Sequence, residues 1–97
     1  MTNQGTIKLS DVEIGVGLAQ LSGWSVVEYK LQKKFTFPDF ITAFSFMTKV
    51  ALLAETHAHH PEWSNVYNRV TIELTTHDAG GITPKDFALA QAIDQLR

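Results

Sequence analysis

The feature that most constrains the fold is the run from Phe40 to Ala54, which is apolar around most of its circumference when it is placed on a helix. At about 100° per residue, one face of this helix collects most of the apolar side chains. That face consists of Phe40, Ala43, Phe44, Met47, Val50, Ala51 and Ala54. Because further apolar residues flank it on both sides, the helix must be buried on more than one side. We expect the second covering surface to be another subunit, so the sequence predicts a homo-oligomer formed through the helix Phe40–Ala54.

Two prolines bracket this helix. Pro38 and Asp39 suit its first turn, where the N–H that proline lacks is not needed. The helix must end before Pro61, because the residue that precedes a proline is pushed out of helical geometry. The segment Glu55–Trp63 therefore lies where a helix ends and a strand begins, and it holds three of the four histidines in the chain.

Two hairpins are predicted, one before and one after the long helix. Residues 24–29 are rich in β-branched and aromatic side chains and residues 30–37 alternate, although no Asn-Gly or Asp-Gly pair marks the turn between them. The second hairpin is predicted from residues 65–67 and 70–76, with its turn at Asn68-Arg69. The core-facing side chains of its second strand are Val70, Ile72 and Leu74.

Capping signals place a helix at each end of the chain. Ser10-Asp11 opens the first helix, and Gly23 is expected to stop it. Thr83-Pro84 opens the last helix, with Asp86 in the capping-box position. The predicted order is α-β-β-α-β-β-α, an α+β fold with a four-stranded antiparallel sheet and helices packed on one face.

The composition agrees with one ordinary domain spanning residues 1–97, with residues 1–9 expected to be a loose N-terminus. The chain is 44% hydrophobic and 19% charged, and its net charge is −2 without a cluster of Lys and Arg, which argues against direct contact with nucleic acid. The lack of cysteine excludes disulfides and thiolate nucleophiles. No membrane span or secretory signal is visible, so we expect a cytoplasmic protein.

The histidines are the groups with the clearest chemical meaning. Imidazoles titrate near neutral pH, and gathering them at two chain reversals beside Glu55 favours proton-transfer chemistry in a cleft. A simpler interpretation is that His59 and His60 only cap a helix C-terminus, where cationic side chains are favoured. His77 could equally be an exposed residue at a strand end.

A longer motif around these histidines favours the functional interpretation. Its elements are Glu55, His59-His60-Pro61, Trp63, Asn65, Tyr67-Asn68, Thr76-His77, Gly81 and Asp86. Together with Gly23-Trp24 and the approach to the long helix at Phe35–Phe40, this motif resembles the pterin-4a-carbinolamine dehydratases over nearly the whole chain.

The resemblance implies that the chain dehydrates a 4a-hydroxytetrahydrobiopterin-type pterin to the quinonoid dihydropterin, with release of water. This step serves tetrahydropterin recycling after aromatic amino-acid hydroxylation, and the family's compact α+β subunits assemble as dimers or tetramers. Loss of water needs a base and an acid, and groups with a pKa of about 7 do both jobs best. We therefore expect no cofactor and no metal.

The resemblance also assigns the site residues. His59 is expected to be the main acid/base, with Glu55 close enough to orient it, while His77 forms the opposite wall and His60 binds and orients the substrate. Catalytic residues are thus His59, His60, His77 and Glu55. The expected substrate contacts are His59, His60, Pro61, Trp63, Thr76, His77 and Asp78.

Other residues and functions stay open as alternatives. His57 is interpreted as a surface residue, and Asp86 as no more than the cap partner of the last helix. A metal site built from the four histidines is a weaker alternative, since adjacent histidines rarely both reach one ion. Some relatives in the family stabilise a homeodomain transcription factor as dimerisation partners, so a partner-binding role is the second alternative.

Overall fold

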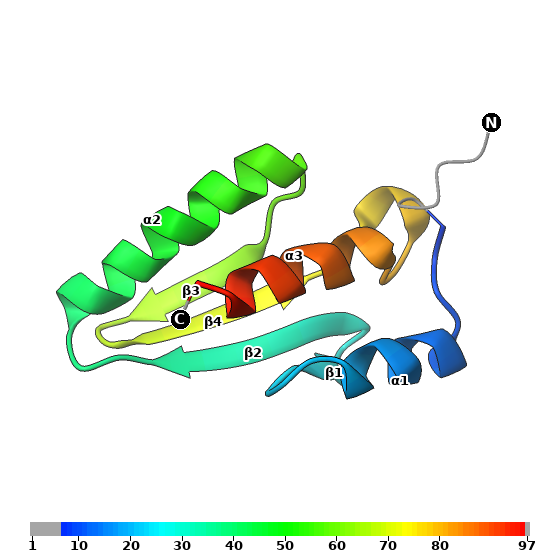
Figure 1. Ribbon diagram of the computed structural model, residues 1–97, viewed down its shortest axis with the longest axis horizontal. Coiled ribbons are helices and arrows are strands. Elements are labelled where there is room, and N and C mark those ends of the chain that lie inside the picture. Colours follow the sequence, from blue (N-terminus) through cyan, green and yellow to red (C-terminus); the bar gives the residue numbers. More distant parts are fainter. Residues whose placement is uncertain (1–6, 97) are drawn as a thin grey trace.

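The computed structural model describes residues 7–96, which form a four-stranded sheet and its covering helices (Figure 1). The elements in chain order are α1 (Asp11–Ala19), β1 (Ser25–Val27), β2 (Lys30–Thr36), α2 (Phe40–His57), β3 (Glu62–Val66), β4 (Arg69–Leu74), the 3₁₀ turn η2 (His77–Ala79) and α3 (Pro84–Asp94). This order confirms the predicted α+β fold. Residues 1–6 of the expected loose N-terminus lie outside the described residues. In the remaining part of that segment, residues 7–9, the Leu9 N–H donates to the Ile82 carbonyl at 2.8 Å.

The sheet has the strand order β1-β2-β4-β3, and every neighbouring pair is antiparallel. The central ladder pairs β2 with β4, from Leu31 opposite Leu74 to Phe35 opposite Val70 along the covered face. These four side chains are buried, and α2 and α3 lie on that face (Figure 1). Because successive strand residues alternate between faces, the other face carries polar side chains.

Both hairpin turns use residues with positive φ where glycine or asparagine is usual. Glu28 (φ 50°) and Tyr29 (φ 66°) connect β1 to β2, and Tyr67 (φ 50°) begins the turn between β3 and β4. The turn lies at residues 67–68, between the end of β3 and the start of β4, so the predicted turn at Asn68-Arg69 is wrong by one residue. The side-chain amide of Asn65 bridges this turn by donating to the carbonyls of Tyr67 and Arg69, which moves the reversal toward β3.

The start and end of α2 follow from local capping. Asp39 is the N-cap rather than a residue of the first turn, and its carboxylate accepts the Thr42 N–H at 2.8 Å. These contacts with Thr42 hold the pKa of the Asp39 carboxyl below its usual value. At the other end Ala58 adopts the left-handed conformation (φ 52°), so the helix stops before Pro61 as predicted.

The buried face of α2 differs from the predicted one. Its buried residues are Ala43, Phe46, Val50 and Ala54. Phe46 replaces Phe44 on this face because its ring packs against Phe35 and Phe37, at centroid distances of 4.8 and 4.9 Å. The members of the predicted face that remain exposed are Phe40, Phe44 and Ala51. The helix thus buries only one narrow stripe within its own subunit.

The first helix also ends earlier than expected. It begins at the predicted capping box, in which Ser10 and Glu13 bond reciprocally, but its last helical residue is Ala19 rather than one next to Gly23. Gly17 lies against the Phe87 ring, where a Cβ would approach to 2.5 Å, so this glycine permits the close contact between α1 and α3. Among residues 7–96, no helix is both long and apolar enough to cross a membrane.

Replacing Phe46 with Ala should lower the free energy of unfolding by about 3–5 kcal/mol, because it leaves a cavity beneath α2. The matched control is Phe44→Ala on the same helix, whose side chain is 57% exposed. We expect a much smaller loss for Phe44→Ala in urea unfolding followed by circular dichroism. Equal losses for the two variants would contradict the assignment of the buried face.

Candidate active site

A hollow of about 290 Å³ lies between the end of α2, the end of β4 and the start of α3. Its lining residues are Ala58, His59, His60, Thr75, Thr76, His77, Asp78 and Lys85. We call it the histidine hollow. It brings together the three predicted catalytic histidines with two of the expected substrate contacts, Thr76 and Asp78.

His59 is held at the inner wall of this hollow. The left-handed Ala58 reverses the chain, and the His59 N–H donates back to the Ala54 carbonyl at 3.0 Å. This turn directs the imidazole toward α3, where its Nε2 lies 2.5 Å from Oδ1 of Asp86. The His59 side chain is only 11% exposed.

Asp86 is completely buried, and its carboxylate collects hydrogen bonds from three separate segments. Oδ2 accepts the Thr83 N–H and the Thr76 hydroxyl, both at 2.9 Å, while Oδ1 faces His59. A buried carboxylate is tolerated when its oxygens are paired in this way. Because the Thr76 hydroxyl gives its proton to Asp86, the Thr83 hydroxyl at 2.7 Å donates to Thr76.

This arrangement fixes the orientation of the His59 ring. A carboxylate oxygen only accepts hydrogen bonds, so Nε2 of His59 is the nitrogen that donates. In the neutral ring, Nδ1 is then the basic nitrogen. From the sequence, Asp86 is expected only to cap α3, whereas in the structure it both caps the helix and accepts from the His59 ring. The capping box could have indicated this second role. Only one carboxylate oxygen of Asp86 is used by the cap, so the other is available to a residue of another element.

Glu55 pairs with His60 and not with His59 as expected. The Glu55 carboxylate lies 2.5 Å from Nε2 of His60, and both side chains are largely exposed. The position of Glu55 on the last turn of α2 explains this, because His59 turns inward after Ala58 while His60 stays at the surface. The predicted orientation of His59 by Glu55 is therefore corrected to orientation by Asp86.

His77 has its own carboxylate partner, which the sequence did not indicate. Nε2 of His77 lies 2.9 Å from Oε2 of Glu62, and the other oxygen of Glu62 accepts from the Lys30 ammonium at 2.6 Å. The bond from Lys30 is the main cause that holds the pKa of the Glu62 carboxyl below its usual value. Glu62 and Lys30 come from strands on opposite sides of β4, so only the sheet order brings them together.

Three predicted site residues do not line the hollow, namely Glu55, Pro61 and Trp63. Trp63 lies opposite Ile72 in the β3–β4 ladder and is 36% exposed. Lys85, at the start of α3, lines the hollow without having been predicted. Within the described part of the chain, no group of three or more His, Asp or Glu side chains is placed to hold a metal ion, so geometry does not favour the four-histidine metal site.

Comparison with known proteins now assigns the family. The family model described as Pterin 4 alpha carbinolamine dehydratase matches residues 7–96. The chain belongs to this family. A relative from Solibacter usitatus named for pterin-4-alpha-carbinolamine dehydratase is 60% identical over 91 residues, which cover 94% of this chain and 96% of the relative. A relative of the same name from Rhizorhabdus wittichii is 54% identical over 90 residues, covering 91% and 93%.

A solved structure supports the same assignment. The crystal structure of a transcriptional coactivator/pterin dehydratase from Brucella melitensis superposes with a TM-score of 0.89 and is 41% identical. The match covers 92% of this chain and 97% of that one. The pterin dehydratase family places the chain among the hydro-lyases, enzymes that release water from their substrate.

Replacing Thr76 with Val should lower the free energy of unfolding by about 1–3 kcal/mol. The change keeps the shape of the side chain, but it removes one donor from the buried Asp86 carboxylate and the acceptor of the Thr83 hydroxyl. Thr75→Val is the matched control, since the neighbouring Thr75 is only half-buried. Urea unfolding of both variants measures the difference, and an equally stable Thr76→Val protein would argue against the Asp86 network.

Proposed function

We propose that the chain dehydrates a 4a-hydroxytetrahydrobiopterin-type pterin to the quinonoid dihydropterin, with His59 and His77 as the acid/base pair. The observation that carries the proposal is their shared hollow, in which each imidazole has a carboxylate on Nε2. Family membership supports the class of substrate. The roles of the individual residues rest on the geometry.

The reaction needs one proton removed and one proton supplied. A base takes the proton from the ring N–H, and the electron pair left behind forms a C=N bond to the neighbouring carbon. The bond from that carbon to its hydroxyl breaks at the same time, and an acid protonates the departing oxygen, which leaves as water. Nothing is oxidised or reduced, so proton transfer by side chains is sufficient.

The two histidines differ in how strongly their surroundings support a positive charge. Asp86 is buried and lies against His59, so its carboxylate acts on the ring with little screening by solvent. This favours His59 as the base that becomes an imidazolium. Glu62 is 40% exposed, and its second oxygen accepts from the Lys30 ammonium while the first faces His77. His77 is then the imidazole of the same hollow that is left to protonate the leaving hydroxyl.

The remaining site residues are proposed to bind and orient the pterin. His60 and Glu55 form an exposed pair at the outer rim, while Thr76 and Asp78 line the histidine hollow. Pro61 and Trp63 act mainly through the loop that carries the histidines. The proposed setting is tetrahydropterin recycling in the cytoplasm, downstream of an aromatic amino-acid hydroxylase.

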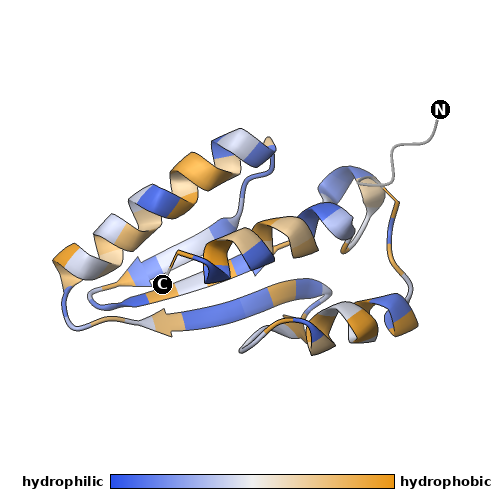
Figure 2. Ribbon diagram, in the orientation of Figure 1, coloured by the Kyte–Doolittle hydropathy of each residue, from blue (hydrophilic) through white to orange (hydrophobic). Residues whose placement is uncertain are grey.

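The exposed side of α2 supports a proposed homodimer or homotetramer. Large apolar side chains outside the core stripe include Phe40, Ile41, Phe44 and Leu52, and all are exposed by 47–76%. Figure 2 shows hydrophobic residues recurring along α2 between hydrophilic ones, up to its hydrophilic last turn. A patch of this kind on one helix is typical of an interface between subunits.

A partner-binding role is the second candidate, because the Brucella melitensis neighbour is named as a coactivator as well as a pterin dehydratase. The same exposed side of α2 would contact the partner. This role does not require the histidines, so an inactive His59/His77 double variant that still rescues a cellular phenotype would separate it from catalysis.

The catalytic proposal is tested by stopped-flow absorbance of 4a-hydroxytetrahydropterin decay. We expect the wild-type protein to accelerate decay, and His59→Ala and His77→Ala to lose about 100-fold or more of that acceleration. His57→Ala is the control, because His57 is an exposed histidine of α2 outside the hollow. A folded His59→Ala protein with the full dehydration rate would refute the proposed role of His59.

The assembly proposal is tested by placing a charge on the exposed side of α2. Phe44→Glu should convert the oligomer to monomers in sedimentation velocity, because burying the new carboxylate in an apolar interface is costly. Val16→Glu is the control, since Val16 is an exposed apolar residue of α1. An unchanged sedimentation coefficient for Phe44→Glu would place the interface elsewhere.

A further inference from the structure

Two more hollows continue from the histidine hollow along the surface. The middle hollow, of about 230 Å³, shares Thr75 and His77 with the histidine hollow and is also lined by the β1–β2 turn. The next one, of about 380 Å³, shares Tyr29, Gly80 and Gly81 with the middle hollow. We call this largest one the Tyr29 hollow. The three hollows therefore lie next to one another in a row that begins at the imidazoles.

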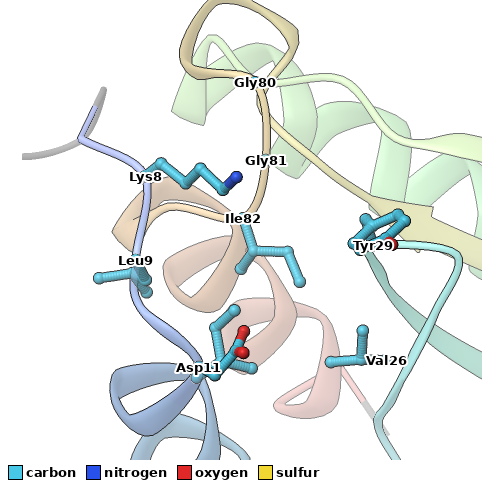
Figure 3. A pocket seen from close by; sticks show the side chains of 9 residues that line it. Lys8, Leu9, Asp11, Val26, Tyr29, Gly80, Gly81 and Ile82 are labelled. Atoms are coloured by element: carbon cyan, nitrogen blue, oxygen red, sulfur yellow. The ribbon is translucent and has the colours of Figure 1, made fainter.

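The Tyr29 hollow has an apolar wall with charged groups beside it (Figure 3). The apolar lining residues are Leu9, Ile14, Val26 and Ile82, and the charged ones are Lys8 and Asp11. The Lys8 stem lies against Gly81, where a Cβ would approach its Cε to 3.0 Å. Gly81 therefore lets the Lys8 stem lie close against this side of the hollow.

Tyr29 stands at the boundary between the middle hollow and the Tyr29 hollow. It is 83% exposed, so its ring contributes little to the core. It also adopts a φ of 66°, a conformation that bulky residues rarely occupy and that Asn or Gly would adopt at lower cost. Figure 3 shows the ring facing the hollow from the side opposite Lys8. An exposed aromatic side chain retained in an unfavourable conformation beside a cavity suggests a ligand contact.

We propose that the Tyr29 hollow receives the side chain carried by the reduced pterin ring, a short hydroxylated alkyl chain, and that Tyr29 selects substrates by this chain. The inference rests on the proposed dehydratase function. A pterin ring held between His59 and His77 can extend its substituent past His77 along the middle hollow, which His77 also lines. The Tyr29 hydroxyl, the Lys8 ammonium and the Asp11 carboxylate suit the hydroxyl groups of such a chain, while Val26 and Ile82 suit its carbons.

The test compares two substrates whose 4a-hydroxy adducts differ only in this substituent, a methyl group in one and a dihydroxypropyl chain in the other. Tyr29→Asn removes the ring but keeps a residue that tolerates positive φ. We expect the ratio of kcat/KM for the dihydroxypropyl substrate over the methyl substrate to fall about ten-fold or more in this variant, since loss of a pocket contact acts on the substrate that uses it.

Tyr67→Asn is the matched control. Tyr67 is also a tyrosine with positive φ in a hairpin turn and is 61% exposed, but it lines none of the three hollows. Its substrate ratio should stay within about two-fold of the wild-type ratio. An unchanged ratio in Tyr29→Asn, or an equal fall in Tyr67→Asn, overturns the inference while leaving the dehydratase intact. If the wild-type protein accelerates decay of neither substrate, the proposed function and this inference both fail.

Discussion

A buried carboxylate, that of Asp86, is the interaction on which the candidate site depends. It joins the first turn of α3 to the loop after α2 through His59, and to the end of β4 through Thr76. Each of these segments lies at one end of a secondary-structure element, so their relative positions would otherwise be set only by loops. Because the carboxylate is fully buried and its hydrogen bonds come from several directions, moving any one segment would take a partner away from a buried charged group. The stability of this corner and the orientation of His59 therefore have the same origin.

The three histidines of the site each meet a carboxylate, but these carboxylates differ in burial. The Asp86 side chain is 0% exposed, that of Glu62 is 40% exposed and that of Glu55 is 76% exposed. Solvent screening weakens a charge pair as exposure rises, so the three pairs should not act alike. This gradient runs from the inner wall of the hollow to its rim. The His59–Asp86 pair is therefore the one that solvent screens least.

Local patterns in the sequence predicted those features that depend on neighbouring residues. The capping box of α3, the alternation in β4 and the end of α2 before Pro61 all follow from short-range geometry, and the structure has each of them. The errors arise from tertiary packing. Phe46 rather than Phe44 is buried because the rings of Phe35 and Phe37 lie beneath that part of α2. No spacing in the chain could pair Glu62 with Lys30 or Asp86 with His59, since those contacts depend on the sheet order and on the docking of α3.

If Asp86 fixes the ring of His59, the tautomer of that ring is determined by the buried carboxylate and can be measured. Long-range ¹H–¹⁵N correlation spectra of the neutral protein distinguish a protonated Nε2 from a protonated Nδ1. We expect His59 to carry its proton on Nε2, facing Asp86, and Asp86→Asn to reduce this preference while the tautomer of His57 stays as in the wild type. A His59 ring protonated on Nδ1 in the wild-type protein would show that Asp86 does not fix the ring in this way. Nε2 would then have no proton to donate to the buried carboxylate.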